Sequence, residues 1–307
     1  MAYQTTYDVT GNREDLTDDV VNITPRETYL LSNLRRTSCK ARLHEWQSDV
    51  LTAAATPAGI EGADSTTTTR TARVRRSNLT SINKTLVTVS DTQQDVDMAG
   101  ASNELDYELY ETGMKEHARD WEKGFIQSTS ATGASGTART MSGFGEVITT
   151  NVNSSAASRD FTYALNYSLA ETIANAGGTP DVYYFKSAVV IDIAAHPLSA
   201  GGGGSTAAPV VISAPTGGIT DFYEFYHDSF GRKKLVPNVG NFAIPTATAS
   251  GGVFALTTKV CSIAFLRPTH VKPLAYLGGG PRYKIETEAT LVFGIETAHG
   301  KWLGISN

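Results

Sequence analysis

The chain has 307 residues, of which 40% are hydrophobic and 19% charged, and its formal net charge is −5. These values are typical of a globular protein and exclude a chain that is disordered throughout or basic throughout. No apolar run approaches the roughly 18 residues that a membrane-spanning helix needs, and the acidic N-terminus lacks the basic-then-apolar order of a secretory signal. We therefore expect neither a membrane partner nor export.

The N-terminal segment is acidic and has no clear hydrophobic period. Up to residue 30, six acidic residues oppose two arginines, which leaves a local charge of −4. Asp15, Asp18 and Asp19 lie in its middle, without the further ligands that would complete a cation site. The apolar run "TYLLSNL" then predicts a small helix. We interpret residues 1–36 as an acidic arm with an anchoring helix, and a disordered tail is the alternative.

The next segment predicts a long β-hairpin. Residues 43–52 indicate a short strand with Leu43, Trp46 and Val50 as its anchors, and residues 79–92 indicate a long strand rich in β-branched side chains. A polar stretch with glycines joins the two strands. Since a single hairpin is not stable alone in water, we expect this one to lie on its own domain or on another chain.

Four arginines crowd the returning side of this hairpin in a chain that is otherwise acidic. They could neutralise several phosphates, but no aromatic residue is interleaved, and Glu61 and Asp64 flank the segment. Arm and hairpin carry opposite charges, and self-assembly of neighbouring copies explains both. We therefore favour acidic protein surface over phosphate as the partner of Arg70, Arg73, Arg75 and Arg76.

The rest of the chain mixes helices and strands. Residues 103–127 predict the longest helix, because apolar residues recur there at three- and four-residue steps, and residues 160–176 predict a second one. Between them, "FGEVITTNV" indicates a strand or a crossing segment. Residues 221–238 alternate around a glycine turn, which is typical of a hairpin. The two C-terminal strands, "KVCSIAFLRP" and "KIETEATLVFGI", complete an α+β chain.

Motifs for catalysis or cofactor binding are absent from the sequence. It contains no GxxxxGK[ST], GxSxG or HExxH pattern. The six histidines are scattered and are not paired with cysteines at the spacing of metal ligands. Cys39 and Cys261 lie far apart in the chain, so we expect two buried free thiols. We expect no enzyme, cofactor or metal site, with a hydrolase whose site we do not recognise as a remote alternative.

Both ends of the chain resemble a known family. The opening "TYDVTGNREDLTDDVVNITPRETYLLSNLRR", the following "LHEWQSDVL" and "EGAD", and the closing "KIETEATLVFGIETAHGKW" are similar to the major capsid protein of tailed bacteriophages. That family has the capsid fold that tailed phages share with herpesviruses. The resemblance covers the chain nearly end to end and is looser through residues 130–255.

The resemblance implies a domain organisation. It has an N-terminal arm, an extended β-hairpin loop, a peripheral domain built on a long spine helix, and an axial domain. Carried over to this chain, these are residues 1–42 for the arm, 43–100 for the loop, 101–150 and 255–307 for the peripheral domain with its spine helix at 103–127, and 151–254 for the axial domain.

The resemblance also implies a function. Pentamers and hexamers of the chain would close into an icosahedral shell around double-stranded phage DNA, assembled in the cytoplasm of a bacterial host. Its partners would be further copies, a portal protein, a scaffold or decoration protein, and the packaged DNA. Another virion or shell protein, such as a decoration, tail or encapsulating-compartment subunit, is the alternative. The residues expected at contacts between subunits are Asp15, Asp18, Asp19, Trp46, Glu61, Asp64, Arg70, Arg73, Arg75 and Arg76.

Overall fold

The computed structural model describes most of the chain. The described residues are 28–51, 70–96, 103–155, 159–186, 211–212, 225–238 and 252–305, together with 54, 56, 60–62, 64, 189 and 244. Asp15, Asp18 and Asp19 of the expected arm lie outside them, as does the glycine-rich loop at 201–204.

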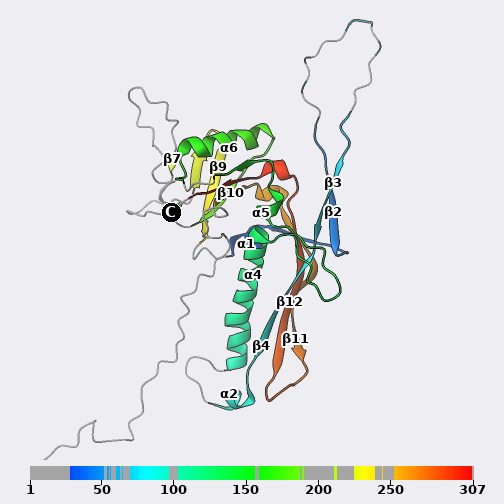
Figure 1. The fold of residues 1–307 in the computed structure, drawn as a ribbon, viewed down its shortest axis with the longest axis vertical. Helices are drawn as coiled ribbons and strands as arrows, with labels where there is room; N and C mark the ends of the chain where they lie inside the picture. The colour runs from blue at the N-terminus through cyan, green and yellow to red at the C-terminus, as the bar shows by residue number, and fades with distance from the viewer. Residues whose placement is uncertain are drawn as a thin grey trace, which may run out of the picture.

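A long helix packed along a four-stranded sheet forms the lower half of the molecule in Figure 1. The sheet has the order β1-β11-β12-β4, with β1 parallel to β11 and the other neighbours antiparallel. The expected C-terminal strands are thus confirmed as a pair. The strands are β1 (Arg35–Ser38), β4 (Ser81–Thr88), β11 (Ser262–Leu274) and β12 (Arg282–Val292).

The spine helix confirms the strongest helix prediction. It runs through α3 (Glu104–Asp106), the π-helical η1 (Tyr107–Gly113) and α4 (Met114–Gln127). Asn103 caps it, since its Oδ1 accepts the Leu105 amide at 3.0 Å. Gly113 lets the helix approach the sheet, because a Cβ atom there would lie 3.1 Å from Val87 Cγ2.

A second, seven-stranded sheet lies beside the upper end of the spine helix (Figure 1). Its order is β5-β13-β10-β6-β9-β8-β7, and α6 (Tyr163–Asn175) packs on it through Leu169 and Ile173, which contact Trp302 and Tyr183 in one buried cluster. The strands are β5 (Val152–Asn153), β6 (Val182–Lys186), β7 (Val211–Ile212), β8 (Phe225–Asp228), β9 (Gly231–Asn238), β10 (Gly252–Leu256) and β13 (Gly300–Leu303).

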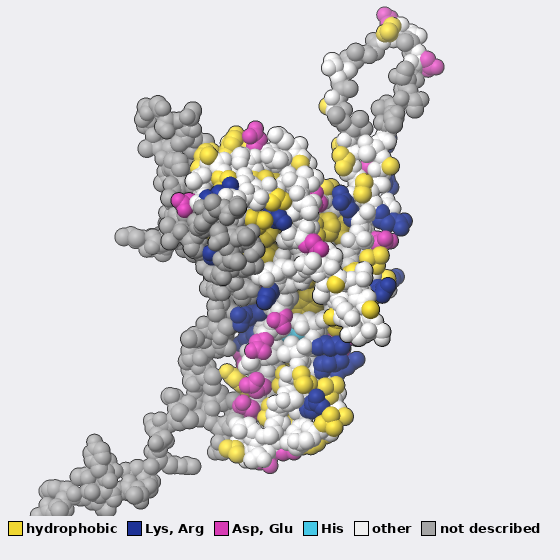
Figure 2. All heavy atoms as spheres, viewed as in Figure 1, with side chains coloured by type: hydrophobic (Ala, Val, Ile, Leu, Met, Phe, Trp, Pro, Cys, Tyr) yellow, Lys and Arg dark blue, Asp and Glu magenta, His cyan; other side chains and the backbone are white. Residues whose placement is uncertain are grey.

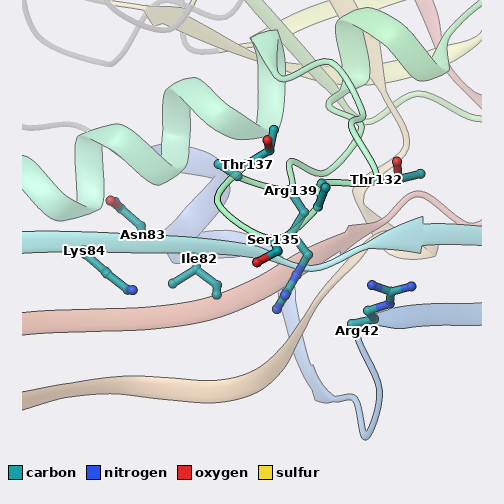
Figure 3. Close-up of a pocket in the computed structure, with 11 residues that line it drawn as sticks. Arg42, Ile82, Asn83, Lys84, Thr132, Ser135, Thr137 and Arg139 are labelled. Atoms are coloured by element: carbon teal, nitrogen blue, oxygen red, sulfur yellow. The ribbon is translucent and has the colours of Figure 1, made fainter.

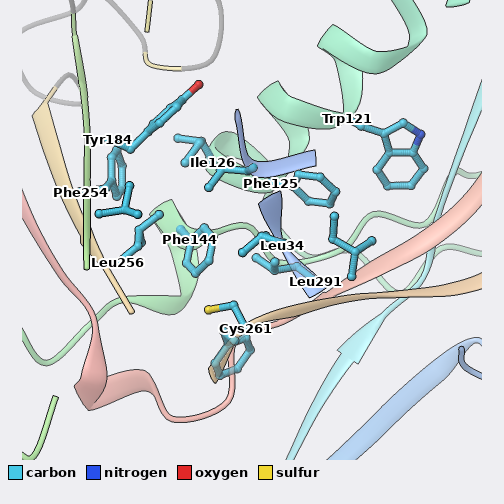
Figure 4. Packing of buried hydrophobic residues seen from close by; sticks show 14 of the residues in the cluster. Leu34, Trp121, Phe125, Ile126, Phe144, Tyr184, Phe254, Leu256, Cys261 and Leu291 are labelled. Atoms are coloured by element: carbon cyan, nitrogen blue, oxygen red, sulfur yellow. The ribbon is translucent and has the colours of Figure 1, made fainter. Parts of the chain in front are cut away.

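The main core joins the two sheets. Figure 4 shows Phe125 and Ile126 of the spine helix beside Phe144, with side chains of both sheets around them. Leu291 comes from the four-stranded sheet and Tyr184 from the seven-stranded one, and both are buried in this cluster. One continuous core therefore holds the two halves together.

The predicted anchoring helix is confirmed as α1 (Tyr29–Asn33). Leu30 is fully buried in the main core. The buried carboxylate of Glu122, on the spine helix, accepts the amide N–H groups of Leu30 at 2.8 Å and Leu31 at 2.9 Å. Since the first amides of a helix have no partner within the helix, this carboxylate fixes the start of α1 to the spine helix.

Two predictions of secondary structure were wrong. The strand or crossing segment expected at "FGEVITTNV" begins as a short helix, α5 (Phe144–Val147), because Gly143 and Gly145 pack directly on carbonyl oxygens at the end of α4. The long strand expected at 79–92 is confirmed as β4, but its expected pairing was wrong: the returning strand of the hairpin is residues 74–79, and β4 pairs with β12. The remaining short helices are α2 (Asp91–Asp95), η3 (Thr258–Val260) and η4 (Glu296–Ala298).

Candidate assembly interface

The hairpin of β2 (Leu43–Ser48) and β3 (Val74–Leu79) projects away from the rest of the molecule (Figure 1). Trp46 fastens its base from one side. The indole Nε1 donates to the Gly294 carbonyl oxygen at 2.9 Å, and the ring meets Phe293 edge to face at 4.8 Å between centroids. Trp46 therefore anchors the hairpin to its own subunit.

Asn78 fastens the base from the other strand. Its Nδ2 donates to the carbonyl oxygens of Leu291 at 2.8 Å and Ser142 at 3.0 Å, and its Oδ1 accepts the Ser142 amide at 2.9 Å. The side chain is buried. A single asparagine in a polar run has no distinguishing pattern, which is why reasoning from the sequence missed it.

The opposite face of the hairpin carries charge. Arg73 lies 3.6 Å from Asp49, and Arg75 lies 3.5 Å from Glu45, with both arginine side chains 70% exposed. These pairs cross the hairpin within one chain. Exposed and loosely placed pairs contribute little to stability, so both guanidinium groups stay accessible to a further partner.

Beyond the anchored base, the hairpin exposes apolar side chains. Leu51 is 84% exposed and Ile60 is 83% exposed, and Val50 and Val74 are also exposed. The expectation that Leu43 and Val50 would anchor the strand was wrong. Leu43 lies on the face of β2 opposite to Trp46, and Val50 lies beyond the end of the strand.

The end of the projecting segment is acidic, whereas its stem carries both acidic and basic side chains. Glu61 and Asp64 are exposed beside the turn at Gly62, whose φ is +80°. Arg70 is exposed farther along, and Arg76 is half-buried at the base, where its Nε has no hydrogen-bond partner. Figure 2 shows acidic and hydrophobic side chains at the end of the hairpin, and basic side chains together with acidic and hydrophobic ones along its stem. That this hairpin makes contacts between subunits stays a prediction.

The buried histidine and cysteine beside each other do not form a nucleophilic pair. The Cys261 sulfur lies 3.6 Å from His299 Nε2, but this nitrogen donates to the Phe293 carbonyl oxygen at 2.9 Å, and Nδ1 accepts the Thr257 amide. Burial raises the pKa of the Cys261 thiol and lowers the pKa of His299. A neutral thiol beside a neutral imidazole is structural, which confirms the expectation of buried free thiols for Cys39 and Cys261.

The described part of the chain contains no group of three or more His, Cys, Asp or Glu side chains that could hold a metal ion. Within the same residues, no helix combines the length and the apolar character needed to span a membrane.

Known proteins share this architecture. The family model of the SU10 major capsid protein matches residues 3–306. Among solved structures, Mycobacterium phage Bobi matches with a TM-score of 0.67 and 13% identity over 98% of this chain and 99% of that chain. The capsid of a native GTA particle matches with a TM-score of 0.67 and 10% identity over 98% of both chains.

A third solved structure, the holo-SrpI encapsulin complex from Synechococcus elongatus, matches with a TM-score of 0.62 and 11% identity over 100% of this chain and 97% of that chain. No curated protein matches the sequence. At these identities the solved structures show the fold alone, whereas the family model spans nearly the whole sequence. The chain therefore belongs to the SU10 major capsid protein family, a family of structural, shell-forming capsid proteins with the tailed-phage capsid fold, and its place is the capsid of a virion.

Proposed function

We propose that copies of this chain form pentamers and hexamers, which close into an icosahedral shell around the double-stranded DNA genome of a tailed bacteriophage. Assembly takes place in the cytoplasm of the bacterial host. A portal protein, and a scaffold or decoration protein, join the same particle. The DNA meets the inner face of the shell without regard to its sequence.

The projecting hairpin carries this proposal. It is anchored at its base by Trp46 and Asn78, yet it exposes Leu51 and Ile60 almost completely. Apolar side chains on a segment with no core of its own are stabilised when a neighbouring molecule covers them. In a shell of identical subunits, that neighbour is another copy.

Under the same proposal, each domain has a role in the shell. The spine helix with the four-stranded sheet serves as the peripheral domain, and the seven-stranded sheet with α6 serves as the axial domain that meets its neighbours around the symmetry axes. Within this plan, residues 1–42 act as the arm, 43–100 as the extended loop, 101–150 and 255–307 as the peripheral domain, and 151–254 as the axial domain.

Electron microscopy of the purified full-length chain tests the proposal. We expect closed icosahedral shells or their capsomers, and we expect particles from infected cells to contain DNA that survives nuclease treatment. A subunit that stays monomeric at high concentration would overturn the proposal.

An encapsulating compartment is the second candidate, because the encapsulin complex shares the fold over the whole chain. Such a shell encloses protein rather than a genome. Nuclease-resistant DNA in particles favours the virus capsid, and particles that hold a co-purifying protein and no DNA favour the compartment.

A further inference from the structure

A groove lined by cations lies between β4 and the loop of residues 132–139 (Figure 3). Its volume is about 610 Å³. Figure 3 shows three basic side chains along it, which are Lys84 of β4, Arg139 of the loop, and Arg42, the residue before β2. Among the described residues that line the groove there is no carboxylate. The groove is therefore a candidate site for an anion.

Two buried carboxylates of the neighbouring strand β12 do not neutralise the whole groove. Glu286 and Glu288 both pair with Arg267, at 3.0 and 2.8 Å. A second cation pairs with each of them, Lys284 with the first and Arg139 with the second. Three cations thus already share these two carboxylates, and only one of the three lines the groove.

The other two cations of the groove are open to a ligand. Arg42 and Lys84 are both exposed. Lys84 faces Glu286 across the pair of β4 and β12, but neither Arg42 nor Lys84 forms an ion pair with any described residue. A ligand with several negative charges would supply the missing partners.

Thr80 holds two of the three cations in place. This residue is fully buried. Its amide donates to the Arg42 carbonyl oxygen at 2.8 Å, and its own carbonyl oxygen accepts Arg139 Nε at 2.8 Å. The backbone of Arg42 and the side chain of Arg139 are thus fixed to one buried residue, and the groove keeps its shape without a ligand.

The loop on the other side of the groove is also held in one conformation. The amides of Ala131 and Thr140 donate to each other's carbonyl oxygens at 3.1 Å, and those of Ala134 and Thr137 do the same at 3.2 and 3.0 Å. Gly133 has a φ of +66°, which favours glycine at this position. The side chains of the loop therefore line a preformed wall, and binding needs little ordering of the chain.

The uncharged side chains of the groove favour phosphate over carboxylate. The hydroxyl groups of Thr132, Ser135 and Thr137 and the amide of Asn83 line it. A phosphate group has more acceptor oxygens than a carboxylate has, so it can use cations and several neutral donors together. Ile82 is the only large apolar side chain among the described lining residues, which leaves little apolar area for a protein segment to cover.

We propose that this groove binds a phosphate-bearing ligand, with Arg42 and Lys84 pairing with its charges and the hydroxyls of Ser135 and Thr137 donating to its oxygens. The ligand is a free oligophosphate, such as pyrophosphate or a nucleoside triphosphate, or the backbone of a nucleic acid. Because Arg42 precedes the hairpin and Lys84 belongs to the four-stranded sheet, a bound phosphate ties the hairpin base to the sheet. The inference goes beyond the proposed function, since one unassembled subunit contains the whole site.

Calorimetric titration of the full-length, unassembled subunit with pyrophosphate tests the site. At constant ionic strength we expect one saturable site per chain. Lys84→Gln and Arg42→Gln should each weaken binding by about tenfold, because each removes a charge-assisted contact. Lys259→Gln is the matched control and should bind like the wild type, because Lys259 is an exposed lysine in the 3-10 turn before β11 and does not line the groove.

A second titration, with a short DNA duplex, distinguishes the two sources of phosphate. Pyrophosphate binding that is stronger than duplex binding assigns the groove to a free oligophosphate. Duplex binding that Lys84→Gln weakens, with no response to pyrophosphate, assigns it to nucleic acid. Either result supports a phosphate site.

Hydrogen exchange locates the bound ligand. Pyrophosphate should slow the exchange of amides in residues 80–86 and 131–140, which form the two walls of the groove, and Lys84→Gln should abolish this protection at the same ligand concentration.

Three results would overturn the phosphate site. The first is that neither pyrophosphate nor the duplex shows saturable binding. The second is equal affinity of Lys84→Gln and Lys259→Gln for whichever probe binds. The third is protection from exchange that is confined to other segments of the chain. None of these measurements involves shell formation, so the phosphate site and the proposed function can fail independently.

Discussion

Replacing Arg73 and Arg75 by glutamate tests the outward face of the hairpin. The guanidinium groups lie 3.6 and 3.5 Å from carboxylates of the same hairpin, and both side chains are 70% exposed. Exposed pairs of this kind contribute about 0.2–1 kcal/mol each. Losing both pairs should therefore lower the free energy of unfolding by at most about 2 kcal/mol, and the subunit should stay folded and soluble.

Assembly should respond far more strongly than stability. A loss of about 1.4 kcal/mol at one contact weakens it tenfold, and a shell repeats the change at every copy. We therefore expect the Arg73→Glu, Arg75→Glu variant to remain as free subunits or capsomers at concentrations where the wild-type chain forms shells. Sedimentation and electron microscopy measure this fraction, and circular dichroism checks the fold.

The matched control is the Arg73→Lys, Arg75→Lys variant, which keeps both charges and should assemble. Arg76 is left unchanged because its Nε is buried at the base of the hairpin, where a charge reversal would also disturb the fold. Normal shells from the glutamate variant would refute the reasoning and show that both arginines form a solvated face.

Two further predictions concern the interior. Asn78→Ala removes three hydrogen bonds at the hairpin base and should lower the free energy of unfolding by about 3 kcal/mol; an unchanged urea midpoint would contradict the anchoring role. Because Cys39 and Cys261 are buried and burial raises the pKa of both thiols, each should react with a thiol reagent at least a hundredfold more slowly in the native protein than in urea. Rapid native labelling would show that the core around them opens.

Regular hydrophobic patterns made the main elements of the fold predictable. The helix at 103–127 and the two C-terminal strands follow from periodicity, which depends on local residues alone. The π-helical stretch at 107–113 and the helix at 144–147 do not follow from such a period. Gly143 lies so close to the Gly124 carbonyl oxygen that a Cβ atom would be 2.7 Å from it, and no sequence period predicts such an approach.

The candidate interface was likewise predictable where a local pattern of residues marks it, and not where it depends on strand pairing. The arginine cluster is visible in the sequence because it interrupts an acidic chain. The pairing of Arg73 with Asp49 and of Arg75 with Glu45 depends on the register of β2 and β3. Lys84 lies opposite Glu286 only because β4 pairs with β12, and that pairing joins residues about two hundred positions apart.

Two buried carboxylates give stability opposite dependences on pH. Burial raises the pKa of Glu122, although the amides of Leu30 and Leu31 oppose this shift. Burial also acts to raise the pKa of Glu296, but hydrogen bonds from Thr149 and Thr150 outweigh it, and the net shift is downward. Their amide N–H groups lie 2.8 and 2.7 Å from Glu296 Oε1.

The direction in which each glutamate's contribution to stability changes with pH follows from proton linkage. With a raised pKa, Glu122 binds its proton more tightly in the folded state, so its contribution to stability grows as pH falls through the raised value. With a lowered pKa, Glu296 stabilises the fold above the pKa of the unfolded chain, and this contribution is lost as pH falls through the lowered value. We therefore expect the destabilisation by Glu122→Gln to be larger at acid pH than at pH 7, and that by Glu296→Gln to be larger at pH 7. Urea denaturation of unassembled subunits at both pH values measures each difference. Equal pH slopes for the two variants would refute the assignment, because both glutamates would then titrate alike in the folded state.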